Sequence, residues 1–473
     1  MVVGDIATGT EVLVIGGGPG GYVAAIRAAQ EGLDTTLVEK AAYGGACLNR
    51  GCIPSKALIT GSGLAHEAGN AEFMGVHADP AVDMGKMVEW KDGVVDRLTS
   101  GVEKLCKANG VNLVPGTASF VDEHTARVAH GGEGQGSESI EFEHAIVATG
   151  SRPVQIPGFD FAEDHVWTSA DALDADTVPD RLGIVGGGYI GMELATTYAK
   201  LGADVTVVEM LDDILQPYED DVKRIVRKRA EELGVEFHFG EGASEWSEAA
   251  DGGYLLHTET EEGEESTYGV DKILVAVGRQ PVTDGLDPER AGIETDDRGF
   301  VETDDRTRTA VEHIHAVGDV AGDPMLAHAA SKEGIVAAEV IAGEPAALDQ
   351  QAIPAAVFTD PEIGTVGMTE AEANEAGFSP VVGQMPLRAN GRALTLNERE
   401  GFVRVVADAD TEFLLGAQIV GPEASELVAE LALGIELGAR LEDVAGTIHT
   451  HPTLSEAVHE AAVAARGEAI HTR

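Results

Sequence analysis

The chain has 473 residues, which is enough for several domains, and 43% of them are hydrophobic, without any run approaching the roughly 20 apolar residues of a membrane span. Its formal net charge of −50, from 32 Lys and Arg against 82 Asp and Glu, argues against nucleic acid and acidic membranes as partners. Three cysteines are too few for a disulfide framework, and the N-terminus lacks signal-peptide and transit-peptide features, so we expect a cytoplasmic protein.

The acidic residues are scattered over many segments, such as TETEEGEES and ETDDRGFVETDDRTR, which is typical of a solvated surface. In a protein with so large a net charge, repulsion among the acidic residues destabilises the folded state. Concentrated salt screens that repulsion, because the Debye length falls from about 10 Å at 0.1 M to about 3 Å at 1 M. The composition therefore predicts a halophilic protein.

The first recognisable unit is TEVLVIGGGPGGYVAAIRAAQEGLDTTLVEK. It predicts a strand over residues 12–15, a glycine turn, an alanine-rich helix and a second strand ending at Glu39. The turn fits G-x-G-x-x-G as Gly16, Gly18 and Gly21. Such glycines permit a tight turn and a close approach to pyrophosphate, and the acid accepts ribose hydroxyls. We expect a dinucleotide site here.

Two cysteines follow in GGACLNRGCIPSKAL, and the segment after Cys52 predicts a helix with Pro54 in its first turn. A helix N-terminus stabilises a thiolate and makes it reactive, so Cys47 and Cys52 are candidates for a redox pair. Two alternatives stay open on spacing alone. They could be inert core thiols or two metal ligands, although tetrahedral zinc needs four ligands and Cys106 is distant in the sequence.

The stretch RLGIVGGGYIGMELATTYAKLGADVTVVEM repeats the first pattern with Gly186, Gly188, Gly191 and Glu209. The first glycine and the acid stand at the same separation in both units. Two dinucleotide sites suggest electron transfer between two cofactors. Because a carboxylate favours the free 2′-hydroxyl of NAD over the 2′-phosphate of NADP, we expect NAD at the second site.

Three further segments run from a strand into a glycine: HAIVATGSRP, ILVAVGRQP and HIHAVGDVAG. The third places Asp319 at the carboxyl end of a strand, where it faces the ligand crevice of an α/β sheet, or serves as a helix cap. From about residue 352 the pattern changes to strands, one helix near residues 423–438 and a His-rich ending, which indicates a separate α+β domain.

Eight motifs appear in a fixed order over nearly the whole chain: GGGPGG, GGACLNRGCIPSKAL, ATGSRP, GGGYIGMEL, VAVGRQP, HAVGDV, FTDPEIGTVGMTEAEA and HTHPTLSE. In these motifs the chain resembles the flavin-dependent pyridine-nucleotide disulfide oxidoreductases, and among them most closely the dihydrolipoamide dehydrogenases. The resemblance implies an α/β fold of two Rossmann-like domains and a C-terminal α+β dimerisation domain. The implied boundaries are an FAD-binding domain over 1–151, an NAD-binding domain over 152–277, a central domain over 278–347 and an interface domain over 348–473.

The resemblance also implies FAD in the first site and NAD in the second. The residues expected at the FAD are Gly16, Gly18, Gly21, Glu39, Lys56, Thr149, Gly150 and Asp319. Those expected on the NAD side are Gly186, Gly188, Tyr189, Gly191, Glu193, Glu209 and Gly278. No metal is expected.

By the same resemblance, dihydrolipoamide attacks a Cys47–Cys52 disulfide, with Cys47 facing the substrate and Cys52 facing the flavin. His451 of the partner subunit serves as base, oriented by Glu456, and this implies a homodimer. Lys56 is expected to pair with Glu193 near the flavin. The expected partners are lipoyl-bearing proteins, namely the acyltransferases of 2-oxoacid dehydrogenases or the glycine-cleavage H protein.

One departure from the pattern is Tyr189, where dihydrolipoamide dehydrogenases usually carry a small aliphatic residue. It suggests a gate over the nicotinamide face, as in glutathione reductases, or a core aromatic. The alternatives to a dihydrolipoamide dehydrogenase are a reductase of another low-molecular-weight disulfide, and a binding or assembly flavoprotein with a vestigial cysteine staple. A mere staple would need neither His451 nor Glu456.

Overall fold

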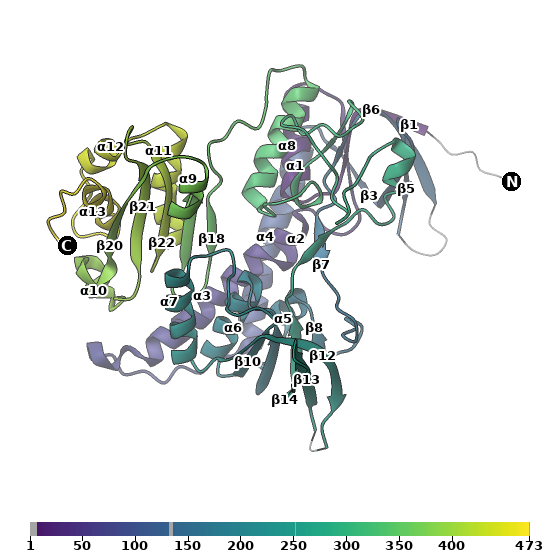
Figure 1. Ribbon diagram of the computed structural model, residues 1–473. Helices are drawn as coiled ribbons and strands as arrows, with labels where there is room; N and C mark the ends of the chain where they lie inside the picture. The colour runs from purple at the N-terminus through teal and green to yellow at the C-terminus, as the bar shows by residue number, and fades with distance from the viewer. Residues whose placement is uncertain (1–6, 132–135, 251, 473) are drawn as a thin grey trace.

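The computed structural model describes residues 7–131, 136–250 and 252–472, and within them the strands form five sheets. Figure 1 shows three main bodies: a first α/β body at the upper right, a second one below it, and a C-terminal body at the left. The α/β class expected from the alternating pattern is present in the structure.

The first body is built on a seven-stranded sheet in the order β3-β2-β1-β6-β5-β4, with β17 paired to β6. Helix α1 lies against α8, and the approach is close because a Cβ on Gly334 of α8 would stand 2.4 Å from the Gly20 carbonyl oxygen. The bounds are β1 Ala7–Ile15, α1 Pro19–Gln30, β2 Thr35–Glu39, β3 Asn112–Pro115, β4 Thr117–Asp122, β5 Thr125–Ala129, β6 Ser137–Val147, β17 Ile314–Ala316, η3 Gly318–Val320 and α8 Ala327–Ile341.

Between β2 and β3 the chain forms α2 Gly45–Arg50, α3 Cys52–Gly69, η1 Ala71–Met74 and α4 Met84–Ala108. The sequence pattern anticipates the helix that begins at Cys52, but not the short helix α2 that carries Cys47. Helix α3 packs against α4 and against α6 of the second body, so the cysteine segment connects the two α/β bodies.

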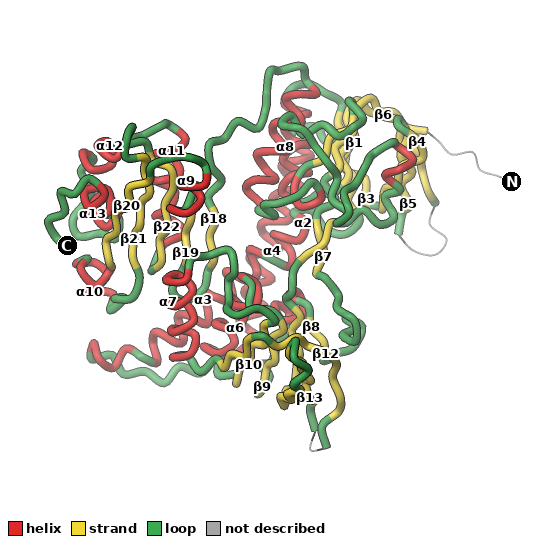
Figure 2. Tube along the Cα trace, in the orientation of Figure 1, coloured by secondary structure: helices red, strands yellow, loops and turns green. Residues whose placement is uncertain are grey.

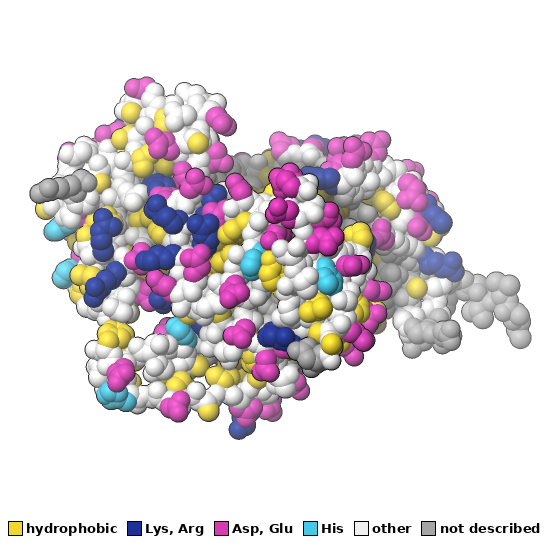
Figure 3. All heavy atoms as spheres, turned by 60° about the horizontal axis from the view of Figure 1, so that its bottom comes forward, with side chains coloured by type: hydrophobic (Ala, Val, Ile, Leu, Met, Phe, Trp, Pro, Cys, Tyr) yellow, Lys and Arg dark blue, Asp and Glu magenta, His cyan; other side chains and the backbone are white. Residues whose placement is uncertain are grey.

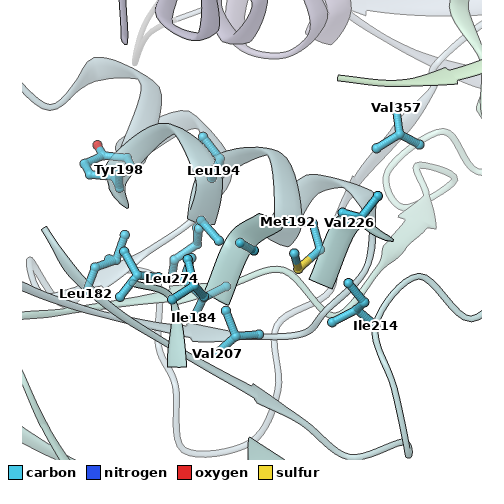
Figure 4. Close-up of a cluster of buried hydrophobic side chains, with 14 of the residues drawn as sticks. Leu182, Ile184, Met192, Leu194, Tyr198, Val207, Ile214, Val226, Leu274 and Val357 are labelled. Atoms are coloured by element: carbon cyan, nitrogen blue, oxygen red, sulfur yellow. The ribbon is translucent and has the colours of Figure 1, made fainter. Parts of the chain in front are cut away.

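The second body has a parallel sheet in the order β11-β10-β9-β15-β8, with an antiparallel β12-β13-β14 sheet beside it. Figure 4 shows its core, in which Met192 and Leu194 of α6 lie over Ile184 and Val207 of the sheet. The bounds are β8 Val166–Trp167, α5 Ser169–Asp174, β9 Arg181–Val185, α6 Tyr189–Lys200, β10 Asp204–Glu209, α7 Asp220–Glu232, β11 Glu236–Phe239, β12 Glu241–Glu248, β13 Tyr254–Thr260, β14 Glu265–Val270 and β15 Lys272–Val275. The strands β7 Ser151–Pro153 and β16 Arg279–Pro281 form a separate two-stranded sheet, and η2 Pro288–Ala291 packs against β4 of the first body.

The C-terminal body is an antiparallel sheet in the order β18-β19-β22-β21-β20, with helices packed on it. Helix α13 approaches β20 so closely that a Cβ on Gly383 would stand 2.0 Å from the Ala461 carbonyl oxygen. The bounds are β18 Ala355–Val357, β19 Ile363–Gly367, α9 Glu370–Glu375, β20 Pro380–Pro386, η4 Leu387–Ala389, α10 Gly391–Leu396, β21 Phe402–Asp408, β22 Leu414–Val420, α11 Ala424–Glu436, α12 Leu441–Gly446 and α13 Glu456–Ala465.

Ion pairs join the C-terminal body to the second α/β body. Arg404 of β21 pairs with Glu219 at 2.6 Å and also with Asp221, while Lys200 of α6 pairs with Asp360 at 2.8 Å. Figure 3 shows one face of the molecule, with Lys and Arg side chains gathered at its left and acidic side chains spread over the rest. No helix among the described residues is both long and apolar enough to cross a membrane.

We predict that the melting temperature falls steeply when KCl is lowered below about 0.5 M, because repulsion among unpaired acidic side chains is then no longer screened. Thermal unfolding from low salt to saturated KCl measures this. Sucrose at matched osmolality is the control, since it strengthens burial without screening charge. A melting temperature that is indifferent to KCl, or that responds equally to sucrose, would contradict the prediction.

Candidate functional site

The two glycine turns have the same backbone geometry. Gly16 and Gly186 have φ of +105° and +108°, which favour glycine. A Cβ on Gly21 would stand 1.8 Å from the Gly16 carbonyl oxygen, and one on Gly191 would stand 2.1 Å from that of Gly186. The first and third glycines of each motif are therefore required by the turn itself.

The acid at the end of each second strand is bound to its own turn. Glu39 accepts the Gly17 N–H at 2.6 Å, and Glu209 accepts the Gly187 N–H at 2.7 Å. Because each carboxylate oxygen has two lone pairs, both acids keep acceptor capacity for ribose hydroxyls. The two turns thus present the same set of groups to a ligand.

A cavity of about 1430 Å³ adjoins the second turn. Its lining includes residues 186–190, 208–211 and 275–281, so it contains the expected Gly186, Gly188, Glu209 and Gly278. Tyr189 also lines it, and desolvation of its phenol by the cavity wall raises the pKa of that group to about 12. The size of the cavity, the glycine cradle and the acid fit a dinucleotide such as NAD.

The cysteine segment lies directly on the first glycine turn. The Gly44 N–H donates to the Gly17 carbonyl at 2.8 Å, and a Cβ on Gly45 would stand 2.5 Å from the Gly18 Cα. A ligand bound at the first turn therefore lies beside the helices α2 and α3 that carry Cys47 and Cys52.

Cys47 and Cys52 are both free thiols. The neighbouring Cys47 thiol and the Lys56 ammonium lower the pKa of Cys52 to about 7. Cys52 is also the first residue of helix α3, and a helix N-terminus favours a thiolate. The surroundings of Cys52 therefore stabilise its thiolate form.

Lys56 and Glu193 form the ion pair that the sequence predicts, with Nζ 2.8 Å from Oε2. Glu193 is 4% exposed and also accepts the Phe358 N–H at 2.9 Å, and Lys56 lies 4.4 Å from the centre of the Phe358 ring. Residues from two distant segments therefore hold the Lys56 ammonium a single helical turn from Cys52.

Replacing Lys56 by Met should leave Glu193 buried without its cation, at a cost of about 3–5 kcal/mol in the free energy of unfolding. It should also raise the pKa of Cys52 above about 7, because the thiolate loses a neighbouring positive charge. Thermal unfolding and the pH dependence of iodoacetamide alkylation of Cys52 measure the two effects. Lys107→Met, which removes an exposed pair with Glu103, is the control. An unchanged alkylation profile would contradict the electrostatic role.

The remaining residues predicted for the FAD meet at the end of the first sheet. Asp319 of η3 accepts the hydroxyl proton of Ser151, and Arg279 donates to the same Ser151 hydroxyl oxygen at 2.8 Å. Thr149 donates to the Val282 carbonyl at 2.6 Å, and Gly150 adopts φ of +73°. This polar end of the sheet, together with the first glycine turn and the exposed Cys52 side chain, fits FAD.

His451 and Glu456 lie in the C-terminal body, with Nδ1 of the imidazole 2.9 Å from Oε1 of the carboxylate. The His451 side chain is 79% exposed. Glu456 also accepts the Thr453 N–H at 2.9 Å, and that bond and His451 lower the pKa of Glu456. Within the described residues His451 makes no hydrogen bond to either cysteine, so one chain does not bring the predicted base and the thiols together.

Comparison with known proteins decides the family. The model of the pyridine nucleotide-disulphide oxidoreductases matches residues 10–334, and the model of their dimerisation domain matches residues 353–462. The chain belongs to the pyridine nucleotide-disulphide oxidoreductase family. The dimerisation domain supports the expected homodimer.

The chain is similar to dihydrolipoyl dehydrogenases over nearly their whole length. It is 75% identical to a dihydrolipoyl dehydrogenase of Haloferax volcanii, covering 100% of this chain and 99% of the relative. For a dihydrolipoyl dehydrogenase of Geobacillus stearothermophilus the identity is 48%, with 100% and 99% covered. The crystal structure of LpdA from Mycobacterium tuberculosis matches with a TM-score of 0.88 at 28% identity, covering 96% of this chain and 99% of that one.

These findings confirm the predicted fold class, the resemblance to disulfide oxidoreductases, and FAD and NAD as the cofactors of such enzymes. The match to relatives from halophilic archaea agrees with the acidic composition.

The sequence reasoning missed several residues at the site. Ser151, Arg279 and Phe358 lie inside or beside the motifs ATGSRP, VAVGRQP and FTDPE, but their partners are distant in the chain. Their place within the motifs was the available signal. The contact that each one makes was not readable from the sequence.

Proposed function

We propose that the protein is a dihydrolipoyl dehydrogenase that oxidises the dihydrolipoyl groups of carrier proteins and reduces NAD⁺, working through a Cys47–Cys52 disulfide. When bound, FAD would supply the two-electron redox chemistry that links the cysteine pair to NAD⁺. The residues that would hold FAD surround the first glycine turn, with Glu39, Lys56 and Asp319. Those that would hold NAD line the cavity at the second glycine turn and include Glu209 and Gly278. Tyr189 would cover this site.

The observation that carries this proposal is the position of Cys52 at the first residue of helix α3, one helical turn from the Lys56 ammonium. Both features favour a thiolate at Cys52. In thiol–disulfide exchange, the sulfur whose thiol has the lower pKa leaves faster. An external thiolate therefore attacks Cys47, and Cys52 leaves as a thiolate.

A substrate thiolate forms a bond to the Cys47 sulfur, the Cys47–Cys52 bond breaks, and Cys52 becomes a thiolate beside Lys56. His451 of the partner subunit takes the proton of this first substrate thiol. The second substrate sulfur then attacks the first substrate sulfur in the mixed disulfide, which closes the lipoyl disulfide and releases Cys47, and Cys47 takes the proton of the second thiol. Two electrons have then passed from the substrate to the cysteine pair.

The same proposal includes lipoyl-bearing proteins as partners, a cytoplasmic location and a division into domains at residues 151, 277 and 347. The proposed mechanism requires a dimer, because His451 and the cysteines of one chain are not in hydrogen-bond contact within the described residues.

The test is the rate of NAD⁺ reduction by free dihydrolipoamide, using the purified yellow protein in multimolar KCl. NADP⁺ and reduced glutathione are run alongside. Rapid NADH formation with dihydrolipoamide and NAD⁺ alone is the expected result. A flavin that NADH reduces but dihydrolipoamide does not would overturn the proposal and favour another disulfide substrate.

A further inference from the structure

Thr453 makes several hydrogen bonds in the loop that carries His451. Its N–H donates to Oε2 of Glu456 at 2.9 Å, and its hydroxyl donates to the Thr450 carbonyl at 2.6 Å. Its carbonyl accepts from Nδ2 of Asn390 at 3.1 Å. The loop is also tied to α11, where His449 pairs with Glu430 at 2.8 Å, but the bond from Asn390 is the one made to the residue that holds Glu456.

Asn390 is buried, with 3% of its surface exposed, and it uses both ends of its amide. Oδ1 accepts the Ala393 N–H at 2.9 Å and caps α10, while Nδ2 donates to Thr453. Ala393 N–H needs an acceptor and Thr453 C=O needs a donor, so this orientation of the amide is the one that satisfies both. Asp would keep the cap and lose the donor. Ser or Thr would cap the helix but would not make the second hydrogen bond, to the Thr453 carbonyl.

The element that carries Asn390 is rigidly packed. Leu387 and Ala393 on either side of it are 1% and 0% exposed. They belong to the same hydrophobic cluster as Leu454 and Ala457, which flank Glu456. The tether therefore connects the loop to a core that cannot easily shift.

We propose that Asn390 is a positioning residue for the thiol half-reaction, because its amide holds the backbone from which Glu456 orients His451. This inference rests on the proposed function, in which His451 is the base. The imidazole is mostly exposed, and Glu456 is its hydrogen-bond partner within the described residues. Releasing the Thr453 carbonyl frees the backbone of Thr453 to shift, which moves the N–H that holds Glu456 and then the imidazole.

Two variants separate positioning from capping. Asn390→Ser keeps an N-cap acceptor and removes the tether, whereas Asn390→Ala removes both. Thr369→Ala is the matched control, because it removes an N-cap of α9 in the same domain, away from the His451 loop. Each variant is measured by melting temperature, by stopped-flow flavin reduction with dihydrolipoamide, and by flavin reduction with NADH. His451→Gln is run in parallel.

The expected result is that Asn390→Ser and Asn390→Ala both slow flavin reduction by dihydrolipoamide about tenfold, the scale of a misplaced catalytic group. The KM for NAD⁺ and the rate with NADH stay unchanged. Asn390→Ala lowers the melting temperature more than Asn390→Ser, because Ser keeps the cap, and Thr369→Ala also lowers it. Since the two Asn390 variants slow the reaction equally while Thr369→Ala does not slow it, a capping role alone cannot produce this pattern.

Wild-type thiol kinetics in Asn390→Ser, beside a slow His451→Gln, would overturn the inference and leave the proposed function standing. Failure of the wild type to react with dihydrolipoamide would overturn the proposed function instead. The crystal structure of Asn390→Ser decides the inference independently of activity. It is expected to show a rotated Thr453 carbonyl and a His451–Glu456 distance well beyond 2.9 Å, and an unchanged loop would overturn it.

Discussion

Replacing Cys52 with Ser abolishes the formation of NADH from dihydrolipoamide, with a fall of more than about a thousandfold, because the covalent route through the cysteine pair is lost. Without a second sulfur, Cys47 cannot form the disulfide that the substrate attacks, and Ser has no thiolate to leave. The purified variant stays yellow, since the first glycine turn, Glu39 and Asp319 are unaltered. The measurement is steady-state NADH formation, normalised to bound flavin.

Two comparisons sharpen this result. NADH-driven reduction of an artificial one-electron acceptor stays within about twofold of wild type, because that route bypasses the thiols. Cys106→Ala, at a buried cysteine in α4, retains NADH formation and controls for the loss of any thiol. Full dihydrolipoamide activity in Cys52→Ser would refute the assignment of the redox disulfide.

Replacing His451 with Gln slows the thiol half-reaction by about 10²–10⁴-fold, the usual contribution of a general base. Gln preserves size and polarity but cannot take the proton of the attacking thiol. Flavin reduction by NADH remains unchanged, because no proton transfer to His451 is needed on that side. Stopped-flow measurement of the two half-reactions on the same preparation gives both rates.

His449→Gln is the matched control for this variant. His449 stands two residues upstream, its side chain is 7% exposed, and it pairs with Glu430 at 2.8 Å. That variant should keep the thiol half-reaction near the wild-type rate. Equal losses in the two half-reactions of His451→Gln would indicate a structural defect and count against the base assignment.

The glycine turns and their acids were predictable from the sequence because the physics that selects them is local. A Cβ on Gly21 or Gly191 collides with a carbonyl five residues away. Glu39 and Glu209 bind an N–H of the turn of the same βαβ unit. Short-range constraints of this kind leave a pattern of residue types at definite spacing, and the cysteine pair and the His451–Glu456 pair belong to the same class.

Long-range contacts leave no such pattern, and the Lys56–Glu193 pair was expected from the family resemblance and not from spacing. The structure adds Phe358, whose N–H donates to Glu193 and whose ring lies beside the Lys56 ammonium. The sequence did not predict helix α2, which contains Cys47, since this short segment beside glycines has weak helical propensity.

The sequence by itself determined the family, the two dinucleotide turns, the redox cysteines as candidates and the salt-adapted surface, because each depends on residue types at close spacing or on composition. The tertiary structure alone decided that Phe358 joins Lys56 and Glu193 beside Cys52, and that Asn390 binds Thr453 in the His451 loop. Those features depend on side chains that meet only after the chain has folded, and the hydrogen bonds they form leave no periodic trace along it.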